Sequence, residues 1–124
     1  MKNKIFISVR ILFALMMINS GLNKFFNFMP IPEMSAAAGD LMEAFSSSGY
    51  IIPLVAIVEV LAGALIITKK FNALGAALIM PVTINIFLIH IVLNPAGFVM
   101  GLVLLLINLW ILIENKDKFN AFYE

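Results

Sequence analysis

Apolar residues run along this chain in four long blocks, and polar residues gather between the blocks. Each block approaches the roughly 20 apolar residues that an α-helix needs to cross the hydrocarbon core of a bilayer. We therefore predict membrane-spanning helices at residues 5–22, 51–68, 71–93 and 95–113. Helix is expected in each block because lipid offers no hydrogen-bond partner to an unpaired backbone group.

Three connections join these blocks, and two of them are very short. The residues KK separate the second block from the third, and NPAG separates the third from the fourth, so neighbouring helices are expected to be antiparallel. The pattern predicts an all-α integral membrane four-helix bundle that forms one domain, residues 1–124.

The long connection, residues 27–50, has a helical pattern of its own. The apolar positions that share one helical face are Met34, Ala38, Leu41 and Phe45. This spacing predicts a short amphipathic helix lying at the membrane interface between spans one and two, with Gly49 as its C-terminal stop. Two interpretations remain for it, a lid over the bundle and a simple connector.

Composition supports the membrane interpretation. Hydrophobic residues make up 63% of the chain, against about 45–50% in a typical soluble domain. The net charge of +1 argues against a nucleic-acid partner. Cysteine is absent and His90 is the only histidine, so the sequence predicts no metal site and makes no cofactor evident.

The distribution of charge predicts the orientation. Four spans place both ends of the chain on one side of the membrane, and most lysines fall on that side: Lys2, Lys4, Lys69, Lys70, Lys116 and Lys118. The opposite side has Lys24 together with Glu33, Asp40 and Glu43. The positive-inside rule then predicts a multi-pass protein of the inner membrane with cytoplasmic N- and C-termini. A signal peptide is disfavoured because Arg10 interrupts the first apolar run.

One carboxylate, Glu59, lies within the apolar segment IVEVLAGALIIT. An ionisable residue near the bilayer centre costs about 2.5–3.5 kcal/mol, so it is expected to face the bundle interior and find polar partners. Counting the helical rise from Lys69 places Glu59 about 15 Å deep, whereas Lys24 falls about 30 Å from Lys4, at the external edge.

Side chains lean toward the N-terminus of their own helix, so Glu59 is expected to lean outward. This direction predicts a ligand pocket that opens outward and is formed by Asn19, Lys24, Glu59 and His90. Three further polar residues are expected to have structural or pocket roles: Arg10, Asn85 and Asn108. The pattern leaves open whether Arg10 pairs with Glu59, and whether Glu59 only fixes helix contacts.

The segments SGLNKFF, VEVLAGALII and PVTINIFLIHIVLNPAG, following an arginine in the first span, resemble the DoxX family of small four-helix membrane proteins. The matching positions are Arg10, Gly21, Lys24, Glu59, Gly63, Pro81, Asn85 and His90. The resemblance implies a helical bundle in the membrane. Because the family takes its name from a subunit of an archaeal thiosulfate:quinone oxidoreductase, it also implies a link to redox chemistry. Without cysteine, any thiol step would fall to a partner protein.

The leading functional hypothesis is an accessory inner-membrane protein that binds a small lipophilic molecule in the bundle, with a quinone as one candidate. In this hypothesis the protein supports a redox partner protein. The alternatives are a catalytic membrane subunit of a quinone-linked oxidoreductase, a small transporter, and a purely structural scaffold in the lipid bilayer. Catalytic and non-catalytic functions both fit the pattern.

Overall fold

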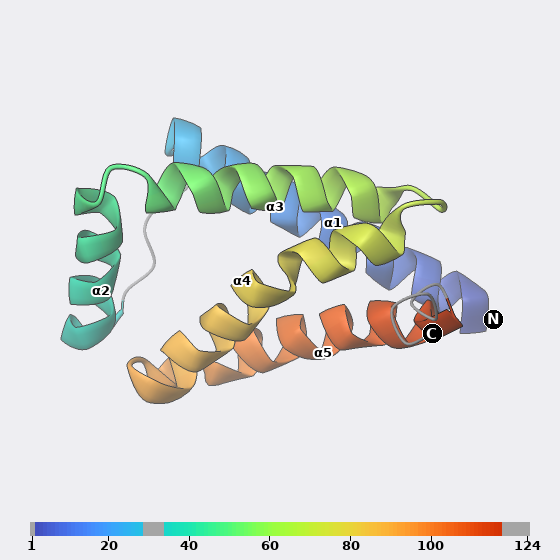
Figure 1. Cartoon of the computed structure of the whole chain (residues 1–124). Coiled ribbons are helices and arrows are strands. Elements are labelled where there is room, and N and C mark those ends of the chain that lie inside the picture. The colour runs from blue at the N-terminus through green and yellow to red at the C-terminus, as the bar shows by residue number, and fades with distance from the viewer. Residues whose placement is uncertain (1, 29–33, 118–124) are drawn as a thin grey trace.

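All regular elements in the described parts of the chain, residues 2–28 and 34–117 of a computed structural model, are helical (Figure 1). The α-helices are α1 (Lys2–Phe26), α2 (Ala36–Ser47), α3 (Ile51–Ile67), α4 (Asn72–Val92) and α5 (Phe98–Glu114). A short 3-10 turn, η1 (Pro95–Gly97), precedes α5. The all-α prediction is confirmed.

The helix boundaries follow local chemistry. Helix α1 continues past the predicted Leu22 to Phe26, and Asn27 then takes a left-handed conformation with a φ of 52°. Helix α5 begins at Phe98 rather than at Pro95, because Pro95 starts the 3-10 turn. Gly49, with a φ of 81°, follows the end of α2 as predicted.

The interfacial helix predicted within residues 27–50 corresponds to α2. The Ser35 hydroxyl caps its N-terminus by accepting a hydrogen bond from the Ala38 N–H at 3.2 Å. Ala38 is buried, whereas Asp40 and Glu43 are exposed, so the predicted apolar and polar faces are confirmed at these positions. Glu33 and Lys118, which entered the charge argument, lie outside the described residues.

The four long helices run antiparallel in chain order (Figure 1). Helix α3 packs between α1 and α4, and α5 packs mainly on α4. One end of the molecule, which we call the lysine end, holds the start of α1, the Lys69–Lys70 turn and the end of α5. The other, which we call the α2 end, holds α2 and the α4–α5 turn. Helix α2 crosses this end at 93° to α3.

Glycines allow the backbones of neighbouring helices to approach closely. A Cβ atom added at Gly75 of α4 would lie 2.7 Å from the Ala62 carbonyl oxygen of α3. At the α4–α5 interface, a Cβ added at Gly101 would lie 3.2 Å from the Phe87 Cα atom. Gly97 and Gly101, spaced four residues apart, therefore serve packing within the chain.

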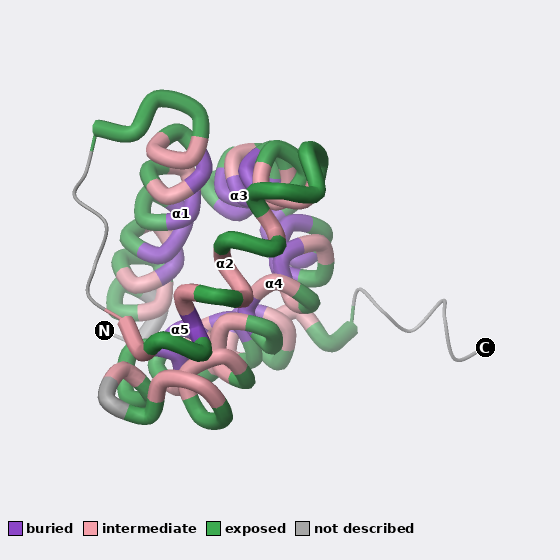
Figure 2. Tube along the Cα trace, turned by 90° about the vertical axis from the view of Figure 1, so that its left-hand side faces the viewer, coloured by how far each residue is buried: buried purple, intermediate pink, exposed green. Residues whose placement is uncertain are grey.

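The core lies between the helices, on the faces that Figure 2 shows as buried. Its largest fully buried apolar side chains are Phe13, Ile66, Ile79 and Ile111. Large apolar side chains such as Leu12, Leu54, Leu74 and Leu106 are more than half exposed on the outer faces. An outer surface of this kind is suited to lipid rather than water.

Two described helices, α1 and α4, are long and apolar enough to cross a membrane on their own. Helix α3 passes the same test together with α2 as a bent pair, and α5 is a shorter apolar helix of 17 residues. The chain is therefore a multi-pass helical membrane protein with two to three candidate spans among its described residues.

Candidate functional site

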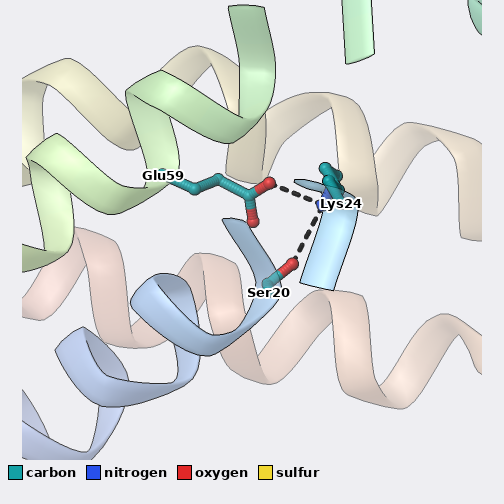
Figure 3. A network of polar contacts seen from close by, with 3 residues as sticks. All are labelled: Ser20, Lys24 and Glu59. Carbon is teal, nitrogen blue, oxygen red and sulfur yellow. Dashed lines mark hydrogen bonds and ion pairs between the residues drawn. The ribbon is translucent and has the colours of Figure 1, made fainter. Parts of the chain in front are cut away.

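The polar side chains of Glu59 and Lys24 meet between α1 and α3 (Figure 3). The Lys24 Nζ atom lies 2.6 Å from the Glu59 Oε1 atom and donates a hydrogen bond to the Ser20 hydroxyl at 2.9 Å. The Glu59 side chain is 1% exposed and the Lys24 side chain 28%. A buried carboxylate is thus joined to a cation that still reaches the surface.

The opposite directions of the two helices bring these side chains together. Side chains lean toward the N-terminus of their helix, so Lys24 leans back along α1 while Glu59 leans toward the α2 end. This direction is the one expected from the sequence. The contact answers the open question about Arg10, because the partner of Glu59 is Lys24.

The separation of Glu59 and Lys24 along the helix axes is smaller than the 15 Å expected from the sequence. Gly21 lies against Ala56 and Val60, and Gly63 lies against Ala14 and Ile18. This register places Glu59 level with Ser20, about one helical turn from Lys24. The expectation fails because it sets Lys4 and Lys69 at one height, whereas α1 and α3 are staggered.

The pair has spare hydrogen-bonding capacity. An ammonium group has three N–H donors, and Lys24 donates one hydrogen bond, to Ser20, while it forms an ion pair with Glu59. The buried Oε1 atom of Glu59 has no hydrogen-bond partner, and its charge is balanced by the ion pair with the Lys24 ammonium. The remaining donor of Lys24 suits a carbonyl, hydroxyl or anionic oxygen of a ligand.

Of the other two residues of the predicted pocket, His90 lies at a different helix interface. Asn19 is exposed on α1 and has an interaction partner of its own. His90 is half-buried, and its Nδ1 atom lies 2.8 Å from the Ile86 carbonyl oxygen of its own helix. Its ring packs against Gly97 and Gly101, at the α4–α5 interface rather than the α1–α3 interface.

Asn108 joins α5 to α4 inside the core. Its Oδ1 atom accepts a hydrogen bond from the Thr83 hydroxyl at 2.6 Å, and its Nδ2 atom donates to the Ala76 carbonyl at 3.0 Å. Asn108 and Thr83 are both fully buried. Of its two expected roles, structural or pocket, Asn108 has the contacts of a structural residue, whereas Asn85 is exposed on α4.

Arg10 lies toward the lysine end and is 7% exposed. Its guanidinium carbon is 5.8 Å from the centre of the Phe6 ring, which in turn meets the Trp110 ring edge-on at 5.3 Å. The Nε atom of Arg10 is buried without a hydrogen-bond partner. Helices α1 and α5 are linked through this aromatic contact.

Three polar residues with buried or paired side chains were not among the predicted site residues: Ser20, Thr83 and Asn72. Ser20 stands four residues before Lys24 on the same helical face, a spacing that could have revealed it. Asn72 is buried near the start of α4 and its Oδ1 atom lacks a hydrogen-bond partner, which no sequence signal indicates. Among the described residues, no group of three or more histidine, cysteine or acidic side chains could hold a metal ion.

Comparison with known protein families identifies a relationship for most of the chain. The DoxX family model matches residues 5–91, which include α2, α3 and nearly all of α1 and α4. No curated protein and no solved structure matches the chain.

Proposed function

Since the chain belongs to the DoxX family, we propose that it is an accessory protein of the inner membrane whose Lys24–Glu59 pair binds a small lipophilic molecule. A quinone is one candidate ligand, and a redox protein is the proposed partner. The observation that supports this proposal most strongly is the 2.6 Å contact between a carboxylate that is 1% exposed and a lysine that remains partly open.

The proposed topology has four spans. Helices α3 and α5 are shorter than α1, yet all four long helices run antiparallel between the same two ends (Figure 1). Exposed lysines Lys4, Lys69, Lys70 and Lys116 gather at the lysine end, so the positive-inside rule places that end in the cytoplasm. The α2 end then faces outward.

Single cysteines test this topology, because the chain has none of its own. In intact spheroplasts, an impermeant maleimide is expected to label Ser46→Cys on α2 directly and Lys70→Cys only after permeabilisation. Both residues are exposed, so access to the reagent decides the result. Labelling in the opposite order would reverse the orientation.

The ligand is proposed to place an oxygen atom beside the Lys24 ammonium and its apolar part along the lipid-facing helices. A quinone carbonyl fits this description because it accepts a hydrogen bond and is attached to an apolar body. A buried ionisable pair in a membrane protein marks a ligand or ion site by default. The same pair used only for helix contact is the competing structural function.

Native mass spectrometry and solvent extraction of mildly solubilised protein separate these functions. The native protein is expected to retain a lipophilic small molecule, and Lys24→Met and Glu59→Leu are expected to lose it. Lys69→Met serves as the matched control, since Lys69 is an exposed lysine at the other end. Equal retention by all variants, or no molecule on the native protein, would leave the pair with a structural function only.

A redox assay separates an accessory function from a catalytic one. The purified chain is expected to form no quinol from a defined electron donor until the partner protein is added. Quinol formation by the chain alone, lost in Glu59→Gln, would instead assign it to the oxidoreductases.

A further inference from the structure

Arg10 is a buried cation that the Lys24–Glu59 site does not use. Its side chain is 7% exposed, and its guanidinium group lies over the Phe6 ring. The cost of a charge held in a low-dielectric environment falls when an anion lies beside it. A carboxylate beside Arg10 would lower this cost.

The described acids have other positions or partners. Glu59 is paired with Lys24, and Glu114 accepts a hydrogen bond from Trp110 at 3.1 Å. Asp40 and Glu43 belong to α2, at the opposite end of the molecule. Asp117, which follows the end of α5, has an exposed side chain. Within residues 2–28 and 34–117, no carboxylate lies within ion-pair distance of Arg10, and its buried Nε donor is unpartnered.

We propose that Arg10 binds the phosphate of an anionic phospholipid in the leaflet at the lysine end. A guanidinium group presents N–H donors in a planar fork that matches two phosphate oxygens. Arg10 stands one turn beyond Phe6 on α1, and the stagger that places Glu59 level with Ser20 also places Arg10 level with Lys69, in the turn at the lysine end, near the depth of the headgroups. The exposed lysines of this end add attraction for anionic lipid.

Trp110 provides a reporter within this proposed site. It is the single tryptophan of the chain, and its ring contacts the Phe6 ring on which Arg10 lies. Lipids with brominated acyl chains quench tryptophan on contact. The quenching of Trp110 therefore measures which lipid occupies the surroundings of Arg10.

The experiment uses the full chain in phosphatidylcholine vesicles that contain an equal fraction of brominated phosphatidylglycerol or brominated phosphatidylcholine. The native protein is expected to be quenched more strongly by the anionic lipid. Arg10→Gln should lower this preference about tenfold or more, as expected for a lost charge-assisted hydrogen bond, and Lys69→Gln only a few-fold. Arg10→Lys should also lower it well below the native value, because lysine keeps the charge but lacks the fork.

Equal quenching of the native protein by both lipids would overturn the proposal without reference to any variant. So would an Arg10→Lys variant that matches the native protein, because general surface charge would then account for the preference. Loss of the preference on adding inorganic phosphate would show that the site takes free phosphate and would overturn the lipid assignment. Circular dichroism establishes that each variant is folded.

Discussion

Gly21 of α1 and Gly63 of α3 make reciprocal backbone contacts on either side of Glu59. A Cβ atom at Gly21 would lie 2.7 Å from the Ala56 carbonyl oxygen, and one at Gly63 would lie 2.8 Å from the Ala14 carbonyl oxygen. The two helices therefore touch through their main chains. This close approach lets the short carboxylate side chain reach a lysine on the neighbouring helix.

Alanine at either glycine is expected to separate α1 from α3. We predict that Gly21→Ala or Gly63→Ala lowers the free energy of unfolding by about 1–3 kcal/mol, the usual cost of overpacking. Thermal unfolding in detergent, or titration with a denaturing detergent, measures the change.

Gly39→Ala is the matched control for these variants. Gly39 lies within α2, where an added Cβ atom would meet only the Met34 side chain at 4.0 Å. Alanine should stabilise α2 here by about 0.5–1 kcal/mol because it restricts the unfolded backbone. A loss at Gly39 as large as at Gly21 would contradict the packing explanation.

The Lys24–Glu59 pair should show coupling in a double-mutant cycle of Lys24→Met and Glu59→Gln. Removing one partner of a fully buried pair costs roughly 3–5 kcal/mol, and the partial exposure of Lys24 reduces the expected loss to about 1–3 kcal/mol. The double variant should lose less than the sum of the two single losses. Strict additivity in the unfolding titration would show that the contact contributes no stability.

We expect the loss of stability on removing an asparagine side chain to depend on whether that side chain is buried. Asn108→Ala removes the two hydrogen bonds that join its side chain to the Thr83 hydroxyl and the Ala76 carbonyl, and should destabilise the protein by about 1–2 kcal/mol. Asn85→Ala removes the same chemical group from an exposed position and should change stability by less than about 0.5 kcal/mol. Equal effects of the two variants on the unfolding midpoint would argue against a structural role for Asn108.

Ser35 attaches α2 to the α4–α5 turn. Its hydroxyl donates a hydrogen bond to the Leu93 carbonyl oxygen and caps α2, and its N–H donates to the Asn94 Oδ1 atom at 3.3 Å. Ser35→Ala should therefore speed hydrogen exchange across residues 36–47. The free energy of local opening derived from the exchange rates should fall by about 0.5–2 kcal/mol, the usual cost of a lost N-cap. Ser46→Ala, on an exposed part of α2, should leave exchange unchanged.

The positions of the helices could be predicted from the hydrophobic pattern of each segment. Apolar blocks bounded by KK and NPAG predict helices close to the observed ones, and the Met34, Ala38, Leu41 and Phe45 pattern predicts α2. These signals are local, because each depends on the periodicity of a single segment. The crossing position of α2 depends on contacts between Ser35 and the α4–α5 turn, residues far apart in the chain.

Only part of the candidate site could be predicted from the sequence, because part of it depends on contacts between helices. The lean of Glu59 toward Lys24 follows from helix direction, which the short turns determine. Their relative height follows instead from the stagger between α1 and α3, which the glycine contacts determine. The location of His90 at the α4–α5 interface likewise depends on which neighbour Gly97 and Gly101 face.

The main-chain contacts at Gly21, Gly63, Gly75 and Gly101 have a mechanical consequence. Sliding one long helix past its neighbour would push a side chain into a backbone carbonyl oxygen or Cα atom, so each of these three interfaces resists translation along its axis. Any movement that accompanies ligand exchange is therefore expected at the contacts in which no glycine packs against a neighbouring backbone. Those contacts are the hydrogen bond that joins Ser35 of the α2 N-terminus to the α4–α5 turn and the Phe6–Trp110 ring contact between α1 and α5.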